Sequence, residues 1–219
     1  MARKSILMSI CCLALFAGCK GTMQDVYYTT TDTLGMASKD TLVNSVLDAR
    51  DTLKSAKDQY VVTMDRFASV PNFKDSELEG KYTQLKYELG QTQSAVRAFK
   101  PAVSNVENVG DSFFNKWSAE LKNYNSDTLR SQSQQKWTQT HQKYLQLLNS
   151  LGKARDSMDT MLAHYDDQLL YVKHNLNSPT MSGMYNEAAA LENKTKNMMT
   201  VVNTTLSDCD KFIGEIAKE

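Results

Sequence analysis

The sequence predicts an all-α protein, an elongated antiparallel four-helix bundle with coiled-coil-like packing and an overhanging middle hairpin. Apolar residues recur at steps of three and four along most of the chain, which is the spacing of one face of a helix. The 219 residues include only 9 glycines and 3 prolines, too few turn-forming residues for a β-sandwich or barrel. With 41% apolar residues, the chain can bury a sizeable core.

Residues 1–18 are predicted to be a lipoprotein signal peptide. Arg3 and Lys4 precede an apolar run over 6–16, which is shorter than the roughly 20 residues of a membrane-spanning helix. The small residues Ala17 and Gly18 stand directly before Cys19, as they do in a lipobox. We therefore expect cleavage before Cys19 and acylation of its thiol, so that fatty chains such as palmitate hold the protein in a membrane.

The mature chain is expected to be mildly acidic and to lie in the bacterial envelope. The chain has 25 basic and 25 acidic residues, and loss of the two basic residues in 1–18 leaves a net charge of −2. By resemblance to Gram-negative lipoprotein sorting, Lys20 stands where an aspartate would retain the protein in the inner membrane. We expect an outer-membrane protein that faces the periplasm. Cys209 keeps its thiol and lies on an apolar stripe, which predicts burial.

Residues 19–37 are expected to form the lipidated N-terminus and a tether, and residues 38–219 the bundle domain. The run Val-Tyr-Tyr-Thr-Thr-Thr over 26–31 suits an extended segment, whereas residues 22–25 and Gly35 bracket the alternative, a short helix. Neither form is favoured by the sequence alone.

Four amphipathic helices are predicted, over about 38–70, 76–123, 127–177 and 179–217. Because the connections are short, consecutive helices are expected to be antiparallel neighbours. The stripes are interrupted at Thr92, Gly110, Thr140 and Gln168. They include Leu42, Val46, Ala49, Leu53, Ala56, Tyr60, Met64 and Phe67; Leu85, Leu89, Val96, Phe99, Val103, Val106 and Phe113; Trp137, Tyr144, Leu147, Leu151, Ala154, Met158, Met161, Tyr165 and Val172; and Met181, Met184, Ala188, Leu191, Met198, Val202, Cys209, Phe212 and Ile216.

Polar residues between the stripes predict where helices begin. Ser76 and Glu79 fit a capping box, in which each side chain bonds to the other residue's amide. The polar residues 123–127 supply a turn and a cap for the third helix. Ser178 is predicted to cap the fourth helix, with Pro179 in its first position.

The middle two helices are predicted to be longer than the outer two. At 1.5 Å per residue they reach about 70 to 75 Å, against about 50 to 60 Å for the first and fourth helices. The middle hairpin should therefore overhang at the end where the first helix begins. Phe114 and Trp117 lie near its tip, and we predict that they contact the membrane or a partner there.

The sequence contains no motif that predicts catalysis. Phosphate-binding glycine loops and the G-x-S-x-G elbow are missing, and the three histidines lie too far apart to share one turn of a helix. The methionines fall mostly on the stripes, which favours packing over copper binding. No basic run accompanies the aromatic residues. We expect no cofactor, no metal, no nucleic-acid partner and no enzymatic activity.

The string Lys-His-Asn-Leu-Asn over 173–177 has two interpretations. Lys173 and His174 oppose the dipole at a helix C-terminus, and asparagine tolerates the left-handed cap conformation. Alternatively, Lys173, His174, Asn175 and Asn177 form a polar recognition patch at the end far from the membrane.

With this string, Tyr27-Tyr28 and Phe113-Phe114 followed by Trp117, the chain resembles the domain-of-unknown-function family 2959. That family comprises uncharacterised Gram-negative envelope lipoproteins with a K-H-N-L-N signature. The resemblance implies a helical, coiled-coil-like envelope lipoprotein with no established activity.

These features favour a non-enzymatic, lipid-anchored envelope scaffold or adaptor. Besides the membrane, its expected partner is an envelope protein or a second copy of the chain. The alternative is a periplasmic carrier or chaperone that binds a hydrophobic or unfolded ligand, which the methionine-rich faces motivate. An enzyme ranks third, because it would need a cluster of perturbed carboxylates or histidines that only the fold could assemble.

Overall fold

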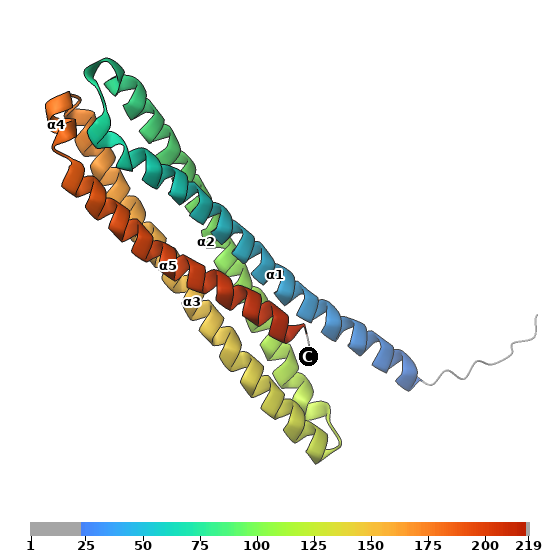
Figure 1. Cartoon of the computed structure of the whole chain (residues 1–219). Coiled ribbons are helices and arrows are strands. Elements are labelled where there is room, and N and C mark those ends of the chain that lie inside the picture. The colour runs from blue at the N-terminus through green and yellow to red at the C-terminus, as the bar shows by residue number, and fades with distance from the viewer. Residues whose placement is uncertain (1–22, 218–219) are drawn as a thin grey trace, which may run out of the picture. The chain divides into compact units, whose positions relative to one another are not determined.

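A computed structural model describes residues 23–217 of the chain (Figure 1). The described residues form two units, one that ends at Met36 and one that begins at Ala37. Helix α1 (Met23–Ala68) includes residues of both units, so the described part of the predicted tether is helical rather than extended. The predicted signal peptide and Cys19 lie outside the described residues.

From Ala37 onward the chain forms the predicted antiparallel four-helix bundle, with no strand among the described residues. After α1 the long helices are α2 (Leu78–Glu120), α3 (Asp127–His174) and α5 (Tyr185–Ile216). Helix α3 packs against both α2 and α5. Helix α1 closes the ring, because Gln59 donates to Glu88 of α2 at 3.0 Å and Arg50 pairs with Asp210 of α5 at 3.0 Å.

One continuous apolar core runs through the bundle, and the predicted stripes supply nearly all of it. Met64 is an exception, because it is half-buried whereas its neighbour Thr63 is completely buried. The Thr63 hydroxyl lies 2.7 Å from that of Thr92, so the two residues that depart from the apolar pattern meet across α1 and α2. Thr140 is buried as well, so two threonines that interrupt the stripes belong to the core.

Gly110, the other interruption of the second stripe, makes room for a tyrosine of α3. A Cβ atom at this position would lie 2.3 Å from the Cε2 and Cζ atoms of Tyr144. Tyr144 is fully buried, and its hydroxyl donates to the backbone carbonyl of Glu107 at 2.9 Å. The close approach of α2 and α3 at this level therefore requires glycine.

The beginnings of α2 and α3 differ in how they are capped. The predicted capping box of Ser76 and Glu79 is wrong, because the short 3-10 helix η2 (Asp75–Glu77) leads directly into α2 and no side chain caps it. Ser76 lies inside that turn rather than in the extended conformation that a cap requires. The polar turn before α3 does supply a cap, since the Ser126 hydroxyl accepts from the Leu129 amide at 3.4 Å.

The predicted fourth helix is broken into two parts. A short helix α4 (Ser178–Ser182) ends at Gly183, and α5 begins two residues later. The cap is Asn177 rather than Ser178, because the Asn177 side chain accepts from the Thr180 amide at 3.0 Å. The Gly183 amide bonds to carbonyls of Pro179 and Thr180, which ends α4 before it can continue into α5.

The hairpin of α2 and α3 projects past the end of α5 (Figure 1). Helices α2 and α3 have 43 and 48 residues, against 32 in α5. The last turn of α5 meets α3 at the ion pair of Lys143 with Glu215, 3.1 Å apart. On the other side, the Lys116 ammonium lies 3.3 Å from the Ser38 hydroxyl of α1. Residues 117–142, which we call the hairpin overhang, extend past the end of α5 as predicted. The prediction that both outer helices are shorter than the middle two is wrong for α1, because α1 has 46 residues against 43 in α2.

Candidate functional site

An aromatic cluster lies at the base of the hairpin overhang, with Phe114 at its centre. The ring centroid of Phe114 lies 4.8 Å from that of His141, 5.0 Å from that of Tyr144 and 6.2 Å from that of Trp137. Phe114 is only 2% exposed. The structure thus places this predicted contact residue in the core, where its ring is not available to a membrane or a partner.

The two tryptophans join the helices of the overhang through hydrogen bonds. The indole N–H of Trp117 donates to the Ser133 hydroxyl at 3.1 Å, and that of Trp137 donates to the Phe114 carbonyl at 3.0 Å. Both side chains are half-buried. Contact of the exposed part of Trp117 with a partner stays a prediction.

The turn of the overhang carries apolar and basic side chains that the sequence analysis did not single out. Tyr124 and Leu129 are 39% and 54% exposed, and Lys122, Arg130 and Lys136 of the same segment are exposed as well. The available signal was the presence of two large apolar residues within and next to a segment that is otherwise polar.

The Lys-His-Asn-Leu-Asn string ends α3, and both of its asparagines take part in the local backbone bonding. The Asn175 side chain donates to the Tyr171 carbonyl at 2.9 Å, and Asn177 caps α4. The left-handed cap expected for asparagine is not observed, because Asn175 has φ −130° and ψ 40°. Lys173 and His174 lie exposed in the last turn, where basic side chains are favoured by the helix dipole. A recognition role for these four residues stays a prediction.

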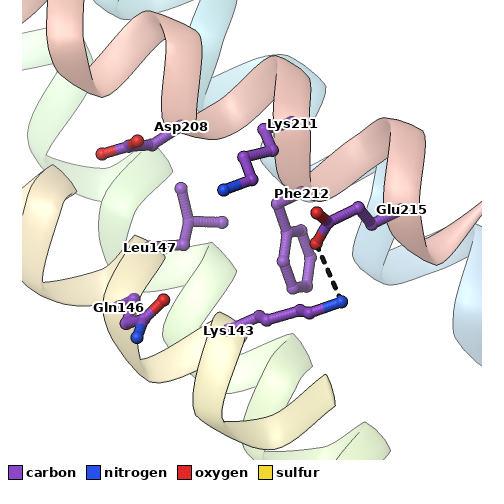
Figure 2. Close-up of a pocket in the computed structure, with 7 residues that line it drawn as sticks. All are labelled: Lys143, Gln146, Leu147, Asp208, Lys211, Phe212 and Glu215. Atoms are coloured by element: carbon purple, nitrogen blue, oxygen red, sulfur yellow. Dashed lines mark ion pairs between the residues drawn. The ribbon is translucent and has the colours of Figure 1, made fainter. Parts of the chain in front are cut away.

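A cleft of about 290 Å³ lies between α3 and α5, near the end of α5 (Figure 2). The buried side chains of Leu147 and Phe212 are apolar, and the remaining lining side chains are charged or amides. One carboxylate, that of Glu215, is paired with Lys143, and another, that of Asp208, accepts from the Ser150 hydroxyl at 2.6 Å. The lining residues are Lys143, Gln146, Leu147, Asp208, Lys211, Phe212 and Glu215.

Hydroxyl groups bridge the helices inside the core, which the sequence analysis also missed. The Tyr60 hydroxyl donates to the Met158 carbonyl at 2.6 Å, and the hydroxyls of Tyr165 and Thr195 lie 2.7 Å apart. Burial raises the pKa of Tyr165 to about 12 and shifts the pKa of Tyr60 upward as well. Throughout the described part of the chain, every buried side-chain polar atom has a hydrogen-bond partner.

Cys209 is completely buried on α5, as its position on the stripe predicted. Burial raises the pKa of the thiol to about 12. Because the thiolate is the reactive form, this cysteine is protected from oxidation and disulfide exchange while the bundle is folded.

Residues 23–217 contain neither a metal-binding cluster nor a membrane-spanning helix. No group of three or more His, Cys, Asp or Glu side chains in this range could hold a metal ion. Within the same range, no helix has both the length and the apolar character needed to cross a membrane.

Comparison with known proteins identifies a family that the chain matches. A family model described as a protein of unknown function (DUF2959) matches residues 27–216, which include all of the bundle helices from early in α1 to the end of α5. No curated protein and no solved structure matches the chain.

Proposed function

This chain belongs to the DUF2959 family, and we propose that it is a non-enzymatic, lipid-anchored scaffold or adaptor of the bacterial cell envelope. In this proposal Cys19 carries the acyl chains, and the bundle stands on the outer membrane and faces the periplasm. The partner is an envelope protein or a second copy of the chain.

The observation that carries the proposal is the hairpin overhang. Helices α2 and α3 extend beyond the level at which α5 ends. In the overhang, the α3 residues over 130–139 are mostly exposed. Within the overhang Leu121 is buried, Trp117 and Trp137 are half-buried, and the indole hydrogen bonds of these two tryptophans hold the two helices together. A stiff helical projection of this kind is suited to presenting a binding surface at a fixed distance from the rest of the bundle.

Site-specific crosslinking in cells tests the scaffold role. A photo-crosslinking amino acid would replace the exposed Gln135 of the overhang, and Gln84, an exposed glutamine of α2 outside the overhang, would serve as the matched control. We expect a discrete adduct at position 135 and none at position 84, with mass spectrometry identifying the partner or a homodimer. Absence of an adduct at native abundance from positions 132, 135 and 139 alike would contradict the proposal.

The anchor and the location have separate tests. Cys19→Ser should shift the protein from the membrane fraction to the soluble periplasmic fraction, because it removes the acylated thiol. Lys20→Asp should shift the acylated protein from the outer to the inner membrane. A membrane fraction unchanged by Cys19→Ser would rule out the acyl anchor, and an unchanged distribution of Lys20→Asp would rule out the sorting rule.

The second candidate is a periplasmic carrier or chaperone for a hydrophobic or unfolded ligand. The cleft between α3 and α5 does not favour it, because most of the side chains that line this cleft are charged or polar. The methionines that motivated this candidate are mostly inside the closed core, including Met158, Met181 and Met198. A hydrophobic ligand would therefore require the helices to separate. Hydrogen exchange of α5 that stays slow in the presence of envelope lipid extracts would argue against a carrier.

A further inference from the structure

We propose that the turn of the hairpin overhang is a second, non-covalent membrane contact that binds an anionic lipid surface. The contact is made by a tip patch, which we define as Lys122, Tyr124, Leu129, Arg130 and Lys136. This inference rests on the proposed acyl anchor for its setting, but one arm of the test below does not need the anchor.

The apolar part of the tip patch is exposed to solvent. Tyr124 is 39% exposed and Leu129 is 54% exposed, which is comparable with Leu145 at 49%. They flank the turn, Tyr124 directly after η3 (Leu121–Asn123) and Leu129 in the first turn of α3. A tyrosine side chain suits the interfacial layer of a bilayer, where one end of the ring meets apolar chains and the hydroxyl meets water, and a leucine side chain can enter the apolar side of that layer.

The charge around the tip patch has the sign that attracts lipid phosphates. The hairpin overhang, residues 117–142, contains three basic and two acidic residues, a net charge of +1. The predicted mature chain carries −2 in total, so the remainder carries −3. Each Lys or Arg near an anionic membrane strengthens binding about fivefold.

The basic side chains of the tip patch differ in whether an ion pair within the protein is seen. Arg130 pairs with Asp127, one turn earlier in α3. Lys122 and Lys136 are exposed. A bilayer offers these ammonium groups its phosphates and offers Tyr124 and Leu129 its interfacial layer, so a single partner accommodates both parts of the patch.

The tip patch lies at the end of the bundle from which the chain runs toward Cys19. Lys116 contacts Ser38, and the turn at Asn125 is nine residues further on, roughly 14 Å at the rise of a helix. The 18 residues from Cys19 to Met36 span at most about 65 Å, whatever path they take. Leu176 lies at the opposite end of the bundle, where α1 ends at Ala68. The 30 residues of α1 from Ser38 to Ala68 span about 45 Å. An acylated Cys19 therefore keeps the tip within reach of the bilayer more readily than the opposite end.

A matched pair of leucines provides the test. Leu129→Cys and Leu176→Cys would each be labelled with an environment-sensitive dye, because both leucines are exposed and Cys209 is buried. The acylated proteins would be reconstituted in vesicles of phosphatidylcholine, with or without one-third phosphatidylglycerol. We expect the dye at position 129 to brighten and shift to shorter wavelength on the anionic vesicles, and the dye at position 176 to stay unchanged. High salt should reverse the response, because it screens exposed charges.

A second arm uses the chain with Cys19→Ser, so that only the tip can hold it to a vesicle. Lys122→Gln/Lys136→Gln should weaken its binding to anionic vesicles about 25-fold, a factor of five for each cation. Circular dichroism would verify that both chains keep the same helix content.

The outcomes separate the tip contact from the anchor. If the acylated protein stays on the vesicles while the dye at position 129 does not respond, the tip contact is wrong and the anchor stands. If acylation is absent but the Cys19→Ser chain binds anionic vesicles through its lysines, the anchor is wrong and the tip contact stands. A response at position 129 in native envelopes but not in pure lipid would mean that the tip binds a protein, which overturns the lipid proposal.

Discussion

Gly110→Ala should lower the free energy of unfolding, although alanine normally stabilises a helix relative to glycine. The added Cβ would lie 2.3 Å from two ring atoms of Tyr144 and 2.4 Å from its hydroxyl oxygen. The ring has little freedom to move, because it packs near Phe114 and Phe212, and its hydroxyl is bonded to the Glu107 carbonyl. Either α2 and α3 must separate or Tyr144 must leave its position.

Two opposing effects set the size of the change. Overpacking a well-filled core costs about 1 to 3 kcal/mol. Replacing a glycine inside a helix by alanine normally raises the free energy of unfolding by roughly 0.5 to 1 kcal/mol. We therefore expect a net loss of about 1 to 2 kcal/mol, which corresponds to a fall in melting temperature of roughly 3 to 6 °C for a domain of this size.

Urea unfolding followed by circular dichroism measures this loss, and Gly90→Ala is the matched control. Gly90 lies in the same helix, but nothing lies within 4 Å of the Cβ it would gain, so alanine should be stabilising there. In a Tyr144→Leu background, which lacks the clashing atoms, Gly110→Ala should lose most of its cost. A Gly110→Ala protein as stable as the wild type would refute the argument.

Three further predictions concern the buried polar groups. Thr63→Val should cost about 1 kcal/mol in urea unfolding, whereas Thr63→Val/Thr92→Val should be nearly neutral because it removes both partners of the buried pair; a double variant worse than the sum of the single ones would contradict this. The pKa of Tyr165 is raised to about 12 in the folded state, so the folded state holds the proton more tightly and stability should fall as pH rises above about 10, with a shallower fall in Tyr165→Phe. Equal pH slopes in the two proteins would count against burial as the cause. Cys209 should react with a thiol reagent only after unfolding, because its side chain is fully buried; rapid reaction of the native protein would show that α5 opens.

The four helices were predictable because the apolar residues repeat with the period of the helix over many turns. The threonines within the stripes were not, since a buried hydroxyl depends on a partner that is distant in sequence. Thr63 and Thr92 are 29 residues apart, and Tyr60 and Met158 are 98 residues apart. No local pattern connects such residues before the helices are aligned.

The helix ends were less predictable than the helices. Ser76 and Ser178 both have the residue type of a cap, but capping also needs a particular backbone conformation. Ser76 lies inside a 3-10 turn, and Asn177 takes the cap position before Ser178.

The sequence also could not decide which of two neighbouring aromatic residues near the overhang is buried. Phe113 and Phe114 lie three and four residues after Gly110, and both steps fit the helical period. Only the packing against α3 shows that Phe114 is the buried one.

The cleft between α3 and α5 could not be predicted from the sequence. Its residues come from 143–147 and 208–215, and each group by itself resembles the ordinary charged face of a helix. The tip patch was closer to prediction, because the polar residues 123–127 already predicted the turn between the second and third helices. Its composition became visible only once the exposure of Tyr124 and Leu129 was known.

The hydroxyl bridges give the bundle resistance to longitudinal sliding. Apolar layers alone tolerate a shift of one helical turn, about 5.4 Å, because one leucine can replace another. Such a shift of α5 along α3 would break the bridges of Tyr165 with Thr195 and of Ser150 with Thr205 together. A tyrosine hydroxyl buried without its partner costs about 1 to 3 kcal/mol, so the helices have one favoured alignment. Because α3 and α5 have one favoured alignment, a force applied at one end of the bundle is transmitted to the other end without the helices sliding past each other.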